Sequence, residues 1–216
     1  MIGLDLRWDG GGALSVLALG AHSDDIEIGC GGTLLTLQER YPLDVTWVVL
    51  GASGEREHEA RVSAERFLER AADGRVLVEG FEDSFFPYHG EPIKRRFEEL
   101  KAERSPDVVL THTRFDLHQD HRLLCELTWN TFRDQLVLEY EVPKWDGDLG
   151  APNVFVPLDE ATAERKIELL LECFPTQAGR PWFTADLFRS LLRLRGMESA
   201  SASGLAEAFY GRKLVL

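Results

Sequence analysis

The chain has 216 residues, of which 44% are hydrophobic and 28% charged, and this composition favours an ordinary globular protein with a single domain over residues 1–216. With 37 acidic against 24 basic side chains, its formal net charge of −13 makes nucleic acid or an anionic membrane surface a poor partner. No apolar run approaches the roughly 20 residues that span a bilayer, and the first residues lack the pattern of a secretory leader. The three cysteines include no C-x-x-C pair and suit a reducing compartment, so we expect a cytoplasmic protein without a membrane span.

Short runs rich in β-branched or aliphatic residues predict four strands in the first half of the chain. They are LSVLALG (14–20), VTWVVLG (45–51), RVLVEGF (75–81) and PDVVLTH (106–112). Segments of helical periodicity separate them, at residues 31–41, 55–72 and 91–104. Alternation of this kind predicts βαβ units around a buried parallel sheet.

After about residue 135 the pattern changes. Residues 136–148 and 153–159 predict further strands around a loop rich in Pro, Gly and Asp, and residues 160–174 predict a helix. We expect this half to extend the same sheet. Because open parallel sheets bind ligands at the carboxyl ends of their strands, polar residues at those ends are the candidates for a functional site.

The first such cluster lies in GAHSDDIEIGCGG, residues 20–32, where His22, Asp24 and Asp25 follow the first predicted strand. Carboxylates beside an imidazole suit a divalent metal. Alternatively, one carboxylate only caps the following helix and His22 is a satisfied core residue. A phosphate-binding loop is disfavoured, because the spacing is not G-x-G-x-x-G and the acidic residues would repel a pyrophosphate.

A second cluster follows the fourth predicted strand, in THTRFDLHQDHR at residues 111–122. Its imidazole and carboxylate residues are His112, Asp116, His118, Asp120 and His121. A zinc site for hydrolysis needs about three protein ligands and one open position, which two strand ends can supply together. The alternative is a charged surface segment that caps a helix.

The segments AHSDD and HQDH resemble the A-H-P-D-D and H-x-D-H motifs of the metal-dependent de-N-acetylases called the PIG-L or LmbE-like family. This family includes the glycosylphosphatidylinositol-precursor deacetylase and the deacetylases of mycothiol and bacillithiol synthesis. The resemblance runs from about residue 14 to the C terminus, through REHEARVSAERFL, KIELLLECFPTQ and LAEAFYGRK. Ser23 replaces the usual proline, which we expect to change loop stiffness more than chemistry.

The resemblance implies a role for each of nine residues. The implied metal ligands are His22, Asp25 and His121. The implied catalytic residues are Asp24 as general base and His118 as acid or electrophilic partner, oriented by Asp120. The implied substrate-binding residues are Arg56, Glu59 and Asp83. The metal is usually zinc, although the same ligands can hold iron, cobalt or manganese. Without the resemblance, the residues themselves do not decide between Asp24 and Asp25 as the base.

Two aromatic features leave alternatives open. FEDSFFPYHG, residues 81–90, either lines a substrate mouth or fills the core between sheet and helices. Trp145, in the loop PKWDGDLGAPN, is a candidate wall over the pocket.

We therefore expect an α/β fold, a Rossmann-like three-layer sandwich with a mostly parallel sheet. The expected function is that of a zinc-dependent hydrolase that removes an N-acetyl group from a small-molecule amino sugar or sugar conjugate, and the resemblance also implies a homo-oligomer. The alternatives are an amidase acting on a larger amide conjugate and a non-catalytic sugar-binding protein on the same fold. A nucleotide-dependent oxidoreductase would share the strand and helix order but lacks its glycine fingerprint.

Overall fold

The computed structural model describes residues 12–214, in which strands and helices alternate along most of the chain. The strands are β1 (Leu14–His22), β2 (Leu43–Gly51), β3 (Asp73–Val78), β4 (Val108–His112), β5 (Leu136–Tyr140), β6 (Val154–Pro157) and β7 (Ala206–Gly211). The α-helices are α1 (Asp25–Arg40), α2 (Glu55–Phe67), α3 (Gly90–Glu103), α4 (Gln119–Thr131), α5 (Glu160–Cys173) and α6 (Ala185–Glu198). Two short 3-10 helices are η1 (Phe86–His89) and η2 (Pro175–Gln177).

The strands form one sheet in the order β3-β2-β1-β4-β5-β7-β6. The strands from β3 to β5 in this order are parallel, whereas β7 runs antiparallel to both β5 and β6. At the centre of the sheet, Ala18 of β1 lies between Trp47 of β2 and Leu110 of β4. The expected mostly parallel sheet is confirmed, and the second half of the chain extends it as predicted.

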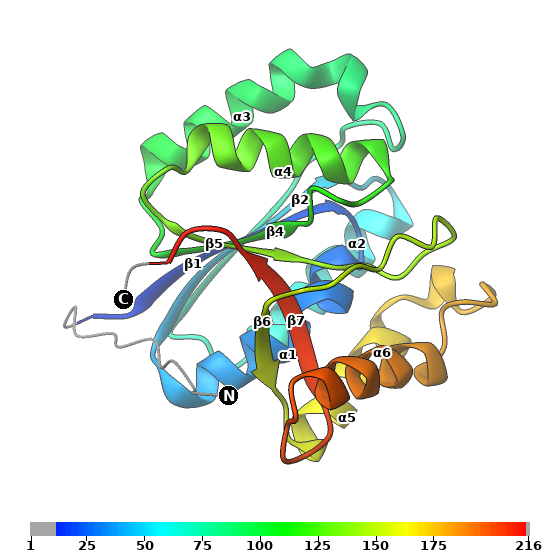
Figure 1. Cartoon of the computed structure of the whole chain (residues 1–216). Helices are drawn as coiled ribbons and strands as arrows, with labels where there is room; N and C mark the ends of the chain where they lie inside the picture. The colour runs from blue at the N-terminus through cyan, green and yellow to red at the C-terminus, as the bar shows by residue number, and fades with distance from the viewer. Residues whose placement is uncertain (1–11, 215–216) are drawn as a thin grey trace.

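Helices cover both faces of the sheet, which makes three layers (Figure 1). Helices α3 and α4 pack together on one face, and α1, α2, α5 and α6 pack against one another on the other. Both faces of the central strands are therefore buried: Val16 and Ala18 belong to one apolar cluster, and Leu17 and Leu19 to the other. This burial explains why the strand segments are continuous apolar runs without a polar alternation.

Helix α1 begins six residues earlier than the sequence predicted, at Asp25, and includes the glycine-rich GCGG segment. These glycines allow close packing. A Cβ atom on Gly29 would lie 2.1 Å from the Tyr140 ring, and one on Gly32 would lie 2.5 Å from Leu158. The glycines thus bring α1 against its neighbours and do not form a phosphate-binding loop.

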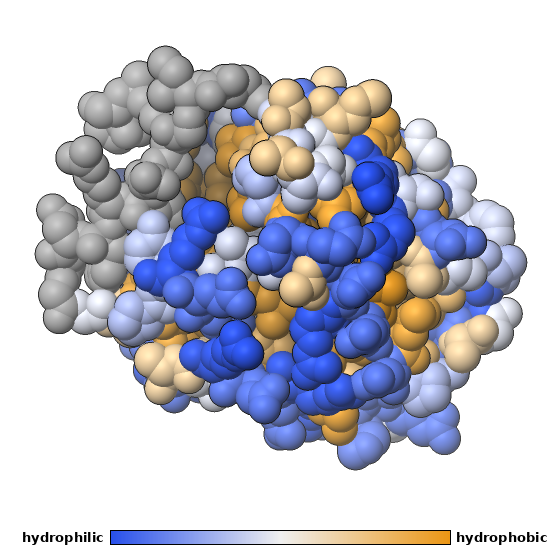
Figure 2. All heavy atoms as spheres, turned by 90° about the horizontal axis from the view of Figure 1, so that it is seen from below, coloured by the Kyte–Doolittle hydropathy of each residue, from blue (hydrophilic) through white to orange (hydrophobic). Residues whose placement is uncertain are grey.

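Helices α4 and α6 and strand β7 were not predicted. Seen from below, the molecule has a mixed surface: hydrophilic side chains run across its centre, and apolar groups lie between them and towards the upper edge of the view (Figure 2). Within residues 12–214, no helix is long and apolar enough to cross a bilayer.

Candidate metal and catalytic site

The two predicted clusters meet at one edge of the sheet. Strand β1 ends at His22 and β4 ends at His112, and these parallel neighbours carry their following loops to the same edge. His22 contacts the second cluster directly, because its Nδ1 lies 3.3 Å from Nε2 of His121. Segments 99 residues apart in the sequence therefore form one site.

Three donor atoms form a nearly equilateral triangle. Nδ1 of His22 and Nε2 of His121 are 3.3 Å apart, and each lies 3.5 Å from Oδ2 of Asp25. A tetrahedral zinc ion with bonds of about 2.0–2.1 Å separates its ligand atoms by roughly 3.3–3.4 Å. The size of this triangle and its two nitrogens and one oxygen therefore fit a zinc ion or a similar divalent metal.

Carboxylates contact both imidazoles through the ring nitrogens that are not part of the triangle. His22 Nε2 lies 3.0 Å from Asp83 Oδ1 and 3.1 Å from Asp120 Oδ2. His121 Nδ1 lies 2.8 Å from Asp116 Oδ2. A carboxylate keeps the proton on the ring nitrogen that it contacts and leaves the lone pair of the other nitrogen for a metal. Both rings therefore present a free nitrogen to the triangle.

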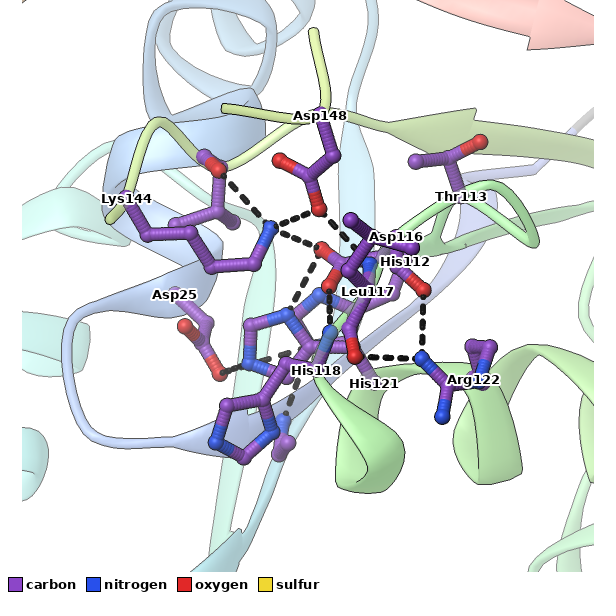
Figure 3. A network of polar contacts seen from close by, with 12 residues as sticks. Asp25, His112, Thr113, Asp116, Leu117, His118, His121, Arg122, Lys144 and Asp148 are labelled. Atoms are coloured by element: carbon purple, nitrogen blue, oxygen red, sulfur yellow. Dashed lines mark hydrogen bonds and ion pairs between the residues drawn. The ribbon is translucent and has the colours of Figure 1, made fainter. Parts of the chain in front are cut away.

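Asp116 belongs to a further network that reaches the loop between β5 and β6 (Figure 3). Lys144 Nζ donates to Asp116 Oδ2 at 2.9 Å and to Asp148 Oδ2 at 2.5 Å. Burial alone would raise the pKa of Asp116, but its contacts with His121 and Lys144 hold that pKa well below the ordinary value. Asp116 is therefore a carboxylate that fixes His121 and is itself fixed by Lys144.

The carboxylates after β1 face the site and do not act as helix caps. Asp25 Oδ2 accepts the backbone N–H of His22 at 2.7 Å and lies 3.3 Å from His112 Nε2. Asp24 occupies the N-cap position of α1 but makes no capping hydrogen bond with its side chain. The interpretation of either carboxylate as a simple cap is therefore wrong.

Asp24 is buried beside the triangle of donor atoms with its backbone at φ 89°, in the left-handed region that Asp and Asn tolerate better than most residues. Its Oδ2 lies 3.2 Å from the Arg56 guanidinium. Burial raises the pKa of Asp24 to about 7, against the opposing charge of Arg56 and with the added repulsion of Asp25. A carboxylate with a pKa near neutrality suits a general base.

Arg56 and Glu59 join α2 to η2 next to Asp24. Arg56 donates to Glu59 Oε2 at 3.2 Å and to the carbonyl oxygen of Ser23, while the Ser23 hydroxyl donates to the Arg56 carbonyl at 2.6 Å. The buried Glu59 accepts the backbone N–H and the hydroxyl of Thr176, both at 2.7 Å. Ser23 therefore makes contacts that the proline of the family motif would not make.

His118 caps helix α4, since its Nδ1 accepts the backbone N–H of Asp120 at 3.3 Å. A neutral ring with this acceptor carries its proton on Nε2. The Asp120 carboxylate instead accepts the backbone N–H groups of Ser84 and Phe86 and contacts His22. We expected the Asp120 carboxylate to orient His118. Instead, the Asp120 backbone N–H contacts His118, because His118 lies at the start of the helix.

Comparison with known families decides the relationship. A sequence model of the PIG-L family, described as GlcNAc-PI de-N-acetylase, matches residues 17–132, which is more than half of the 216-residue chain. The chain belongs to the PIG-L family. The resemblance noted in the two motifs is thereby confirmed, and the matched segment contains all nine residues to which the resemblance assigned a role. No protein with a curated description matches the chain significantly.

Solved structures share this PIG-L fold at low identity. The conserved protein TT1542 from Thermus thermophilus is 21% identical with a TM-score of 0.74, over 94% of this chain and 96% of that one. N,N′-diacetylchitobiose deacetylase from Pyrococcus horikoshii is 20% identical with a TM-score of 0.72, over 96% and 87%. GalB, a 4-carboxy-2-hydroxymuconate hydratase from Pseudomonas putida, is 18% identical with a TM-score of 0.73, over 94% and 97%. These similarities establish the fold alone, which carries both deacetylase and hydratase chemistry.

Several residues of the site in this PIG-L protein had no role predicted from the sequence. Asp116 was seen in the cluster but received no role, although its position five residues before His121 could have suggested one. Lys144 and Asp148 carried no signal, because they reach the site only through the packing of the β5–β6 loop. The backbone amides of Ser84 and Phe86 are invisible to any motif.

Proposed function

We propose that the protein is an N-deacetylase that hydrolyses the acetamide of an amino sugar or sugar conjugate, with a divalent metal, zinc in the first place, held by His22, Asp25 and His121. The observation that carries the proposal is the donor triangle with its 3.3 Å and 3.5 Å edges next to a buried carboxylate, Asp24. Membership of the PIG-L family supports the reaction type.

In the proposed mechanism Asp24 is the general base, and Arg56 influences its ionisation. When bound, a divalent metal supplies Lewis-acid activation of the amide carbonyl and of a water molecule. Asp24 accepts the proton of the attacking water at a carboxylate oxygen. Arg56 keeps part of the Asp24 population ionised at neutral pH by opposing the effect of burial.

His118 acts on the other side of the amide. Its Nε2–H is free to donate to the carbonyl oxygen as negative charge develops there, because Nδ1 is occupied by the helix cap. Asp24 or His118 then protonates the leaving amine. Acetate and a free amino group are the products.

The roles that we propose for Asp83, Arg56 and Glu59 follow from the exposure and contacts of each side chain. We propose that Asp83 accepts a sugar hydroxyl, which is supported by the 70% exposure of its side chain. For Arg56 and Glu59 we propose positioning of Asp24 in place of the direct substrate binding that the family resemblance implied.

The three cysteines are free and buried, which supports a reducing compartment such as the cytoplasm.

The test is acetate release from a panel of N-acetyl sugars and conjugates by metal-stripped and zinc-reloaded protein. Activity should return with zinc and disappear in Asp24→Asn, a substitution that keeps the shape and tolerates the left-handed backbone. Asp146→Asn, an exposed acid on the β5–β6 loop, is the matched control. Cleavage of larger amides only would show an amidase, and sugar binding without cleavage by zinc-loaded protein would show a non-catalytic protein.

A further inference from the structure

Exposed apolar side chains gather on the segments that surround the site. Six of the ten exposed large hydrophobic side chains in residues 12–214 lie on residues 79–89, 113–118 and 141–153, which follow β3, β4 and β5. The other four are Leu171, Leu194, Met197 and Leu214. Isolated exposed apolar residues are normal, but a concentration of them beside a catalytic site indicates a ligand contact.

We call four of the six the apolar rim: Phe85, Leu117 and Trp145, which lie within two residues of Asp83, His118 and Lys144 in the sequence, and Tyr88, whose ring contacts Phe85. Their exposed fractions are 46% for Phe85, 76% for Tyr88, 57% for Leu117 and 78% for Trp145. Leu117 precedes His118, and Phe85 lies two residues after Asp83. The rings of Phe85 and Tyr88 are 5.9 Å apart, so this part of the rim is one continuous aromatic surface.

Hydrogen bonds from the site hold the backbone of the rim in place. The amides on both sides of Phe85, those of Ser84 and Phe86, donate to Asp120 at 2.7 Å and 3.1 Å. The amide of Leu117 donates to Asp148 at 2.7 Å. Trp145 follows Lys144, whose ammonium contacts Asp148 as well as Asp116. The rim is thus pre-organised by Asp120, which also contacts His22, and by Asp148, which shares Lys144 with Asp116, and this lowers the entropic cost of binding.

The charges near the rim select a neutral ligand. The two basic residues on the three segments, apart from histidines, are both paired: Lys144 with Asp116 and Asp148, and Arg114 with Glu139 at 3.4 Å. The exposed acidic residues on these segments include Glu82, Asp83 and Asp146. Arg122 of α4 donates to the carbonyl oxygens of Asp116 and Leu117 and makes no ion pair with another described residue. The exposed acidic residues outnumber this one unpaired cation, so anionic lipids and phosphate-linked groups are disfavoured, whereas a neutral apolar group meets no electrostatic cost.

We propose that the substrate carries a neutral apolar group, alkyl or aryl, beyond its N-acetyl sugar, and that the apolar rim receives this group. The inference rests on the proposed deacetylase function and names its substrate class. A bilayer or a second copy of the chain is broad, so if it covered the rim it would also cover Asp83 and His118. An apolar group on the substrate would instead lie beside Asp83 and His118.

The test compares the binding of methyl and hexyl β-glycosides of N-acetylglucosamine to zinc-loaded Asp24→Asn protein by calorimetry, so that no turnover is needed. We expect the hexyl glycoside to bind about tenfold more tightly or better, since burying even part of its five additional methylenes suffices for this ratio. Trp145→Ala and Leu117→Ala should each reduce the ratio, whereas Met197→Ala, an equally exposed apolar residue on α6, should preserve it.

Equal affinity for the two glycosides, or no measurable binding of either, overturns the proposal. So does binding to phosphatidylcholine vesicles, or a dimer, that is lost in Trp145→Ala, because the occupant is then a membrane or a second copy. Deacetylation of the methyl glycoside by the unsubstituted, zinc-loaded protein is measured separately. Tighter binding of the hexyl glycoside without any deacetylation would refute the proposed function and leave the apolar subsite standing.

Discussion

The guanidinium of Arg56 lies 3.2 Å from the carboxylate of Asp24, and this ion pair connects helix α2 to the proposed general base. Arg56 is held in turn by Glu59 and by the backbone of Ser23. Its charge opposes the rise in the Asp24 pKa that burial causes. The ion pair therefore controls how much of the base is ionised at neutral pH.

Replacing Arg56 by Gln should shift the pH profile of the enzyme. The base must be ionised, so kcat/KM rises with pH through the pKa of Asp24. Without the Arg56 charge this pKa is higher, and the acidic limb should move to higher pH by about one unit. The measurement is kcat/KM for a reactive N-acetyl sugar from pH 5 to 9.

The control for this experiment is Arg61→Gln, which removes a half-buried arginine from the same helix, where it pairs with Glu57. Its profile should coincide with that of the unsubstituted protein. An Arg56→Gln variant with a higher KM and an unmoved acidic limb would show that Arg56 binds substrate and does not tune Asp24.

Replacing Asp116 by Asn should weaken metal binding. Asp116 holds the proton on Nδ1 of His121 and so leaves Nε2 free for the metal. Carboxylates in this position typically contribute 10- to 100-fold in metal affinity, and we expect a loss of about that size. Competition with a chromogenic chelator measures it. Asp146→Asn should leave the affinity unchanged, and an unchanged affinity in Asp116→Asn would contradict the assigned role.

Glu27 should make stability depend on pH. It is fully buried on α1, and neither of its carboxyl oxygens has a hydrogen-bond partner within the described residues. Burial raises the pKa of Glu27 from 4.5 to about 8. Between these values the unfolded chain has lost a proton that the folded chain retains, so Glu27 lowers the free energy of unfolding increasingly as pH rises through this window.

Glu27→Gln removes this titration. At pH 8 the variant should be more stable than the unsubstituted protein by about 4 kcal/mol, and the advantage should vanish near pH 4, where both states of the unsubstituted protein are protonated. Urea denaturation of metal-free protein at the two pH values measures the difference. A stability difference that does not change between pH 4 and pH 8 would refute the raised pKa.

Glu207 should be required for folding stability. It lies on β7, in the AEAF segment that resembles the closing motif of the family, and it is buried against Lys166 at 2.6 Å. It also accepts the backbone N–H groups of Gly32 and Thr33. Glu207→Gln leaves Lys166 as an uncompensated buried charge, so we expect a loss of about 3–5 kcal/mol.

The double variant Lys166→Met with Glu207→Gln is the matched control. Because it no longer buries an unpaired charge, it should recover a large part of the stability lost in Glu207→Gln. Urea midpoints of the three proteins test this. If the double variant is less stable than Glu207→Gln, the loss does not come from the unpaired ammonium.

Local sequence patterns predicted the sheet well, because each buried parallel strand is a continuous apolar run. The first four strands were located within a few residues. The patterns missed α4 because it starts in the polar His-Gln-Asp-His segment, which indicates a functional site and lacks the apolar spacing of a helix. They missed β7 because its inward-facing residues include the charged Glu207, which only the buried Lys166 makes acceptable.

The sequence by itself determined the kinds of residues that we propose as metal ligands and the strand ends on which they lie, since a run of apolar residues followed by His and Asp is a local property. The tertiary structure decided which carboxylate does what: Asp25 faces the imidazoles of His22 and His121, while Asp24 faces Arg56. It also decided that Asp116 and Lys144 support His121, and that Asp120 supports His22. These partners lie up to about 100 residues apart, so only the packing of the whole sheet brings them within hydrogen-bonding distance.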